Sequence, residues 1–337
     1  MPLFISWQFI SLARAVPFSS QRPSITLFKV TAPNQPDTHV QFELQLKRVT
    51  TDAYSDGGTG WGYEDHDGPD TWKGKCANTL GQQSPVDIRA RNIDYTHFEK
   101  LRFLEYDREG AVKVTNKGKS IYVTGFEKWA PYQPEMKGGG LHHRYTLVGV
   151  HLHWSDEDSE GSEHTIGSLH YPVEIHLVHV REGFNLSEAT TKPDGLAVLG
   201  VFVAKNVKND GQSNVDDFVK SFERIENYKE EMTNTNFKVR NLLPKNTEEF
   251  YRYDGSLTTP ECDEAVVWTL LAEPVSIDEV QLQLLRKMKK ANGKVIGENV
   301  RPTQPLNNRR ILYRPNSSAL LSFVKSFSLM FVFIAVQ

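Results

Sequence analysis

The pattern of hydrophobic and polar positions divides the chain into a strand-like middle and two ends of different character. Between residues 61 and 315, short apolar runs alternate with clusters of Gly, Pro, Asn and Asp. The clearest runs are SIYVTGF, TLVGVHLHW, PVEIHLVHV, LAVLGVFVA and AVVWTLL. Runs of this length, bounded by turn-forming residues, are typical of β-strands. A helical period stands out only over 214–225 and 277–290. We therefore predict one β-rich domain with a few peripheral helices.

The N-terminal 60 residues carry no candidate chemistry. Residues 1–20 open with an apolar run that fits a signal peptide cleaved between Ala13 and Ala15, although no basic residue precedes the run and Arg14 interrupts it. Residues 21–60 form an extension of unknown order, in which Val40–Leu46 alternates like a strand.

The C-terminal residues 316–337 form a hydrophobic tail. Small residues from Asn316 to Ala319 precede a terminal apolar run without charges after Lys325. This order resembles a GPI-attachment signal, while 319–336 would also span a bilayer if Lys325 reached the interface. A helix packed on the domain is the third reading. We predict membrane attachment through this tail and leave its kind open.

Composition excludes several classes of protein. With 39% hydrophobic and 11% aromatic residues, the chain can bury a sizeable core, so complete disorder is excluded. A formal net charge of -3 gives no reason to expect a nucleic-acid partner. The two cysteines exclude a disulfide-rich miniprotein and a metal site made of four cysteines.

Three of the 11 histidines form a pattern with chemical meaning. His151 and His153 are two residues apart in one apparent strand, so both side chains project from the same face. A second run carries His176, with Glu174 two residues earlier on the same face. Three neutral imidazoles suit a tetrahedral zinc ion with one position open for water. A chance H-x-H in a strand remains the alternative, and His179 faces away from His176.

The order of eight sequence blocks gives a more specific indication. These blocks are WGYEDHDGPDTW, QQSPVDI, HLHW, GSEHT, VEIHLVH, PDGLAVLGVF, DGSLTTPEC and RPTQPLN. Through them, residues 61–314 resemble the α-class carbonic anhydrases. The resemblance implies a mainly β (α+β) single domain over 61–315, built on a large, mostly antiparallel, twisted central sheet with short peripheral helices.

The resemblance also implies the metal site. His151, His153 and His176 match the family's three zinc ligands, which makes Zn²⁺ the expected cofactor. Glu174 and Asn299 match residues that contact these histidines on the side away from the zinc ion and hold their rings in place.

Further residues match the site where carbon dioxide reacts. Thr258 matches the threonine that accepts a hydrogen bond from zinc-bound hydroxide, and Glu163 matches the acid that orients this threonine. Tyr63 and Asn116 match positions that organise water in the pocket. The residues that match the substrate-binding wall are Val178, Val198, Leu257, Thr258, Thr259 and Trp268.

Three positions depart from the family pattern. Lys119 stands where fast members carry a proton-shuttle histidine, and an ordinary lysine pKa near 10.4 is poorly matched to that role at neutral pH. Gly149 stands where a glutamine usually supports His151. Tyr122 replaces a family asparagine and is expected to crowd the mouth of the pocket.

The cysteines bear on the cellular compartment. In secreted and membrane-tethered members, cysteines at the positions of Cys76 and Cys262 form one disulfide, whereas two free thiols would fit a cytosolic protein. The sequon at Asn185 fits a glycoprotein of the secretory pathway. We expect an extracellular or cell-surface protein.

The function implied by the resemblance is a carbonate dehydratase. Zinc-bound hydroxide would attack carbon dioxide reversibly to give bicarbonate and a proton, and sulfonamides and anions would inhibit the reaction. The alternative is a weakly active or inactive carbonic-anhydrase-like ectodomain that serves in binding, but such proteins typically lack a zinc histidine.

Overall fold

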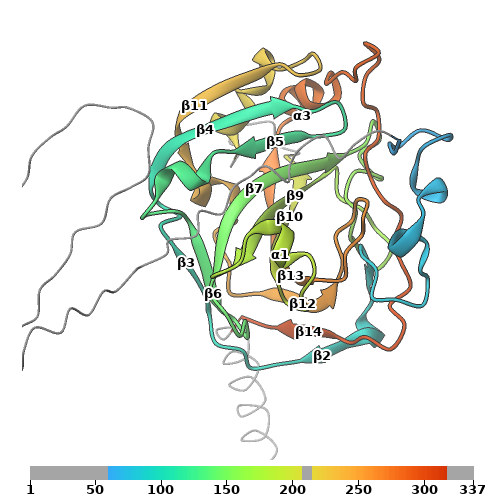
Figure 1. Cartoon of the computed structure of the whole chain (residues 1–337), viewed down its shortest axis with the longest axis vertical. Coiled ribbons are helices and arrows are strands. Elements are labelled where there is room, and N and C mark those ends of the chain that lie inside the picture. Colours follow the sequence, from blue (N-terminus) through green and yellow to red (C-terminus); the bar gives the residue numbers. More distant parts are fainter. Residues whose placement is uncertain (1–59, 207–214, 317–337) are drawn as a thin grey trace, which may run out of the picture. The chain divides into compact units, whose positions relative to one another are not determined.

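The computed structural model describes residues 60–206 and 215–316, in which a large twisted sheet dominates (Figure 1). The strands are β1 (Asp87–Ile88), β2 (Ile93–Tyr95), β3 (Leu101–Leu104), β4 (Glu109–Asn116), β5 (Ile121–Thr124), β6 (Glu135–Gly138), β7 (Tyr145–Trp154), β8 (Thr165–Ile166), β9 (Val173–Arg181), β10 (Leu196–Lys205), β11 (Glu231–Lys238), β12 (Phe250–Gly255), β13 (Val266–Ile277) and β14 (Ile311–Arg314). The α-helices are α1 (Leu186–Ala189), α2 (Asp216–Val219) and α3 (Glu279–Arg286). Short 3₁₀ turns, among them η6 (Phe222–Arg224), connect these elements.

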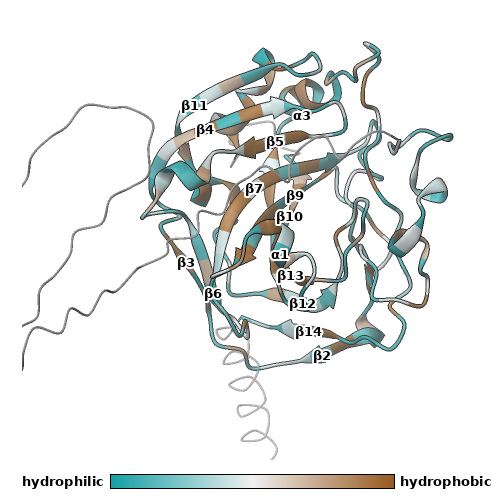
Figure 2. Ribbon diagram, viewed as in Figure 1, coloured by the Kyte–Doolittle hydropathy of each residue, from teal (hydrophilic) through white to brown (hydrophobic). Residues whose placement is uncertain are grey.

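Twelve strands form the main sheet. Its order is β11-β4-β5-β7-β9-β10-β13-β12-β14-β2, and β3 joins it through β6, which pairs with β7. All neighbours in this sheet are antiparallel except β10 with β13 and β14 with β2. The central strands β7 and β10 are mostly apolar, whereas β11 and β12 carry more polar residues (Figure 2). The predicted fold class, a mainly antiparallel β domain with short helices, is confirmed.

The two predicted helices are shorter than their sequence patterns. The segment 277–290 contains α3, which begins after a capping box made by Asp278 and Gln281. The segment 214–225 contains α2 and then the separate 3₁₀ turn η6. Phe218 of α2 and Phe222 of η6 pack against each other with ring centroids 4.9 Å apart. The two aromatic residues are therefore in contact as the helical spacing predicts, although the helix is interrupted between them.

The sheet separates two apolar clusters, and the side chains of β10 contribute to both. Its residues Ala197, Leu199 and Val201 belong to one cluster, while Val198 and Phe202 belong to the other. Successive side chains of a strand point to opposite faces of a sheet, so both faces of β10 are buried. The continuous apolar run that predicted this strand is therefore the signature of a central position in the sheet.

His179 is part of the buried structure on one face of the sheet. Its side chain is fully buried, Nε2 is hydrogen-bonded to the hydroxyl group of Tyr106, and Nδ1 lies 3.1 Å from the carbonyl oxygen of Ala197. The prediction that His179 faces away from His176 agrees with these contacts. Burial lowers the pKa of His179 to about 4.

The lowered pKa of His179 predicts a loss of stability in mild acid. An unfolded histidine binds a proton below about pH 6.5, whereas folded His179 stays neutral down to about pH 4. The unfolded state therefore binds more protons between these values, and the free energy of unfolding should fall by up to about 3 kcal/mol as the pH falls through this window. Urea unfolding at pH 7, 6 and 5 measures this loss. The double variant Tyr106→Phe/His179→Leu, which removes both polar groups, should lose less stability over the same range, and equal losses would contradict the assignment.

The predictions for the two ends lie outside the described residues, apart from Gly60 and Asn316. These are the signal peptide, the extension with its strand-like Val40–Leu46, and the hydrophobic tail. Among the residues that the structure does describe, no helix has both the length and the apolar character needed to span a membrane.

Candidate metal centre

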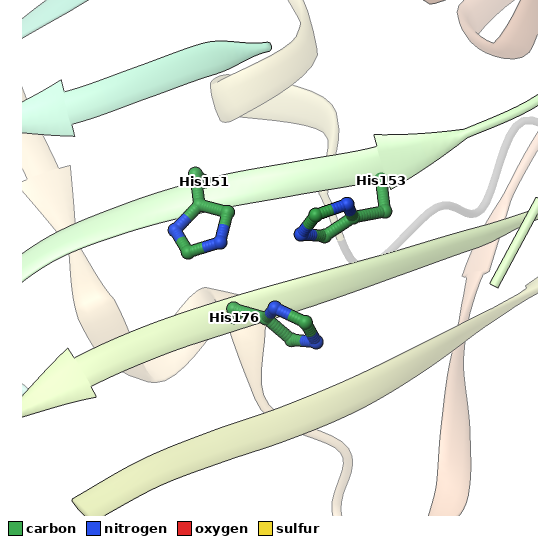
Figure 3. Close-up of side chains that lie close together, drawn as sticks. All are labelled: His151, His153 and His176. Atoms are coloured by element: carbon green, nitrogen blue, oxygen red, sulfur yellow. The ribbon is translucent and has the colours of Figure 1, made fainter. Parts of the chain in front are cut away.

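Three histidine side chains converge on one point of the sheet. His151 and His153 project from β7, and His176 projects from β9, where it is paired directly opposite His151. Each residue offers one ring nitrogen, and the three nitrogen atoms lie within 4.8 Å of one another. Figure 3 shows the rings turned toward a common space between the two strands. The i, i+2 spacing thus places the predicted ligands together.

The ring orientations of two histidines are fixed through their other nitrogen atoms. His153 Nδ1 donates to the carbonyl oxygen of Asn299 at 2.8 Å, and His176 Nε2 donates to Glu174 Oε1 at 2.7 Å. These bonds leave His153 Nε2 and His176 Nδ1 for a ligand. His153 Nε2 is buried and has no hydrogen-bond partner within 60–206 and 215–316.

The electrostatic setting keeps the three imidazoles neutral. Burial, together with the neighbouring His176, lowers the pKa of His153 to about 3. Burial also lowers the pKa of His151 and of His176. Metal ions bind the deprotonated nitrogen, so a site with three neutral imidazoles and an unpartnered buried nitrogen fits Zn²⁺.

A hydrogen-bonded chain extends behind His176. Glu174 Oε1 also accepts from His164 Nδ1 at 2.7 Å, and the hydroxyl oxygen of Tyr253 lies 2.6 Å from His164 Nε2 and 2.9 Å from Ser84 Oγ. Burial alone would raise the pKa of Glu174, but His164 and His176 outweigh it and lower the pKa well below its ordinary value. An ionised Glu174 is a strong acceptor that fixes the tautomer of His176. His164, Tyr253 and Ser84 were missed by the sequence analysis.

Glu163 and Thr258 lie beside the same histidines. Glu163 is completely buried, its Oε1 accepts from the backbone N–H of Arg301 at 3.0 Å, and its Oε2 lies 3.3 Å from His153 Nε2. Burial raises the pKa of Glu163 well above its ordinary value, while the hydroxyl group of Thr258 lowers it. The structure therefore brings together the predicted acid, threonine and ligands.

An apolar wall adjoins the histidines. Val178, Val198 and Trp268 are at most 3% exposed and belong to one cluster, against which the half-buried Leu257 packs. The ring centroids of Trp268 and His176 are 4.8 Å apart. Thr259, also half-buried, follows Thr258 in the loop between β12 and β13.

Of the three predicted pocket residues, Tyr63 and Lys119 line a common cavity, whereas Asn116 does not. The cavity has a volume of about 490 Å³. Burial, and then the charge of Glu163, raises the pKa of Tyr63 well above its ordinary value. Lys119 Nζ lies 3.9 Å above the ring of Trp61. Asn116 is buried, and its side chain bonds to the backbone groups of Glu226, Gly118 and Lys289, so it fixes the turn before Lys119.

A disulfide joins Cys76 to Cys262, with 5.1 Å between the Cα atoms. It links the segment before β1 to the loop that carries Thr258. Within this loop, the backbone N–H of Leu257 donates to the carbonyl oxygen of Asp263 at 3.0 Å. The pairing implied by the resemblance is therefore present, and it braces the threonine loop.

Comparisons with known proteins agree in pointing to one family. A family model described as eukaryotic-type carbonic anhydrase matches residues 67–315. The chain is 50% identical over 272 residues to "Putative carbonic anhydrase 5" of Caenorhabditis elegans, covering 80% of this chain and 86% of that protein. It is 34% identical over 255 residues to "Carbonic anhydrase 3" of Homo sapiens, covering 74% of this chain and 96% of that protein.

Proposed function

Since the chain belongs to the eukaryotic-type carbonic anhydrases, we propose that it catalyses the reversible hydration of carbon dioxide to bicarbonate and a proton. The observation that carries this proposal is the convergence of one nitrogen atom each from His151, His153 and His176. These residues would hold Zn²⁺. Zinc at such a site supplies Lewis acidity, which makes hydroxide available from water near neutral pH, as is established for carbonic anhydrases.

The protein's own groups would bind and orient the reactants. The wall of Val178, Val198 and Trp268 offers carbon dioxide an apolar surface next to the histidines. Glu163, once ionised, accepts the hydroxyl hydrogen of Thr258, which leaves an oxygen lone pair of Thr258 to accept a hydrogen bond from the attacking group. This chain of hydrogen bonds selects one orientation of the nucleophile before substrate arrives.

Removal of the proton is expected to limit the rate because Lys119 occupies the shuttle position. Its ammonium group lies over the ring of Trp61, and lysine is poorly matched to proton transfer at neutral pH. We expect Lys119→His to raise turnover in dilute buffer by about tenfold or more, and added imidazole to raise turnover of the wild type. Stopped-flow measurement at low and high buffer concentration tests this. Unchanged turnover of Lys119→His in dilute buffer would exclude proton transfer as the limiting step.

A stopped-flow hydration assay of the purified full chain tests the proposed function. We expect the rate of carbon dioxide hydration to exceed the buffer rate and to return to it when an aromatic sulfonamide is added. Zinc binding without hydration would instead support the alternative function, a carbonic-anhydrase-like binding ectodomain.

We also propose that the protein enters the secretory pathway and is attached to the cell surface. The disulfide between Cys76 and Cys262 supports this, because structural disulfides form mainly in oxidising compartments. Asn185, the sequon residue, caps α1 through Oδ1, which accepts from the backbone N–H of Glu188 at 2.9 Å. Expression of the full chain in animal cells should give surface protein that carries a glycan, and release by a phosphatidylinositol-specific phospholipase would identify a GPI anchor. Recovery only from the cytosol would contradict the proposal.

A further inference from the structure

A second cavity lies on the face of the sheet that is turned away from the histidines. It has a volume of about 610 Å³ and is lined by parts of β12, β13 and β14 and by the segments that precede β7 and β10. Along β12, Tyr253 contacts His164 and belongs to the apolar cluster of the histidine face, whereas Phe250 belongs to the opposite cluster. Alternation along the strand therefore directs Arg252 toward the face of Phe250.

Arg252 is a buried cation without an ion-pair partner in the described part of the chain, and only the more distant charge of Asp254 favours its charged form. Its side chain is only 4% exposed, and Nε donates to Thr269 Oγ1 at 3.0 Å. Its Nη2 is buried without a hydrogen-bond partner, and no carboxylate of the described ranges lies within 4.0 Å of the guanidinium group. The rings of Phe98 and Phe250, with centroids 5.6 and 5.4 Å away, give partial compensation. Leaving a charged donor unsatisfied in an apolar setting is costly, so the site favours an added anion.

The other residues around the cavity restrict which anion fits. Asp194, Asp254 and Glu264 also line it, and the second lining arginine, Arg310, is already paired with Asp94 at 2.7 Å. Three carboxylates oppose a ligand with several negative charges. Polar Gln82 and His142 also line the cavity, together with apolar side chains that include Phe98, Leu141, Val267 and Leu312. The volume lies within the range of sites for small organic ligands.

We propose that this Arg252 cavity binds a small monocarboxylate, whose carboxylate group pairs with Arg252 and whose remaining atoms contact the apolar lining. The site is separate from the metal centre and independent of the proposed function. Because Nε of Arg252 is bonded to Thr269, the two Nη groups would form the bidentate donor pair of the kind that recognises carboxylates.

Benzoate is a suitable probe, with the zinc-loaded full chain saturated with an aromatic sulfonamide so that the metal centre is closed to it. Isothermal titration should show saturable benzoate binding to the wild type. Arg252→Met should weaken it by about tenfold or more, whereas the matched control Arg310→Met should change it by less than about threefold.

Two results would overturn the proposal. One is that benzoate binds the wild type and Arg252→Met with equal affinity, or shows no saturable binding to either protein. The other is a large drop in the thermal midpoint of Arg252→Met, because a methionine of similar volume should leave stability unchanged or raise it if the charge is uncompensated. Arg252→Lys keeps the charge without the planar donor pair, and its affinity should lie between the other two.

A second inference concerns how His151 is held, and it rests on the proposed function. Unlike the other two histidines, His151 has no hydrogen bond at its outer nitrogen, since its Nδ1 is buried without a partner in the described part of the chain. Gly149, two residues earlier at a bulge in the pairing of β7 with β9, offers no side chain. This agrees with the expectation that a supporting contact is missing.

Tyr122 contacts His151 in another way. The two residues are paired across β5 and β7, and their rings are stacked with centroids 5.5 Å apart and planes inclined by 24°. Lys117 Nζ lies 4.9 Å from the centroid of the Tyr122 ring. We infer that Tyr122 is a positioning residue that fixes the ring of His151 by stacking, in place of a hydrogen bond.

Zinc affinity, measured by competition with a chelator, tests the role of Tyr122 without an activity assay. Tyr122→Leu should weaken zinc binding by about tenfold, Tyr122→Phe should retain it, and Gly149→Gln added to Tyr122→Leu should restore it. Equal zinc affinity of Tyr122→Leu and the wild type would overturn the inference and leave the proposed function intact. Absence of zinc binding by the wild type would overturn both.

Discussion

Replacing His153 with asparagine is expected to abolish carbon dioxide hydration and to remove zinc from the purified protein. The nitrogen atom lost is His153 Nε2, which lies in the cluster of three ligand nitrogens and has no other hydrogen-bonding role in the described chain. Loss of a residue that only supports a ligand typically weakens metal binding about 10–100-fold, so loss of a ligand should weaken it by more than about 100-fold. Metal analysis and stopped-flow hydration assays measure both effects.

The same substitution at His142 is the control for His153→Asn. His142 is exposed and lies outside the cluster of ligand nitrogens, so His142→Asn should retain full zinc content and activity. Full zinc content in His153→Asn would show that the metal binds elsewhere.

The substitution Thr258→Ala is expected to lower kcat/KM about 100-fold while zinc content stays at the level of the wild type. Thr258 is 4% exposed, and its hydroxyl group is close enough to the buried Glu163 to lower the pKa of that carboxyl. In the proposed mechanism the hydroxyl group would orient the nucleophile without binding the metal, and removal of one such preorganised group commonly costs 10²- to 10³-fold.

Thr258→Ser keeps the hydroxyl group and separates orientation from packing. It should recover most of the activity lost in Thr258→Ala, because the serine oxygen can still bond to Glu163. Activity of Thr258→Ala equal to that of the wild type would remove Thr258 from the mechanism. Parallel loss of zinc and activity would instead indicate that the loop braced by Cys76–Cys262 had collapsed.

The strands and the paired histidines could be predicted from local pattern. Apolar runs bounded by turn residues identified β7, β9 and β10, and the period of two along a strand placed His151 and His153 on one face. His176 and Glu174 followed from the same rule in a second run. These features depend only on residues a few positions apart.

The pairing between strands could not be predicted from these patterns. His151 lies opposite His176 only because β7 pairs with β9 in one register, and that register shifts between Leu147 and Gly149. A shift of one residue would turn a strand's side chains to the other face, so the metal site depends on a long-range choice. The hydrophobic pattern of one strand does not indicate which strand pairs with it or in which register.

Contacts between distant segments account for what the sequence analysis missed. His164 stands next to Glu163 in a quoted block, but its partner Tyr253 is 89 residues away. Ser84, the partner of Tyr253, is in turn 169 residues from Tyr253. Arg252 lies in an alternating strand, where a charged residue is ordinarily taken as solvent-facing. Its burial follows from packing of Phe98 and Phe250 around it.

Reconstitution with zinc tests most directly the claim that one zinc ion, held by His151, His153 and His176, carries out the hydration. The full chain is stripped of metal with a chelator, and the hydration rate is then measured as zinc is added back. The rate should be at the buffer level without metal, rise in proportion to added zinc, and stop rising at one zinc per chain. A hydration rate that survives complete removal of metal, or one that stays at the buffer level with zinc bound, would contradict the account.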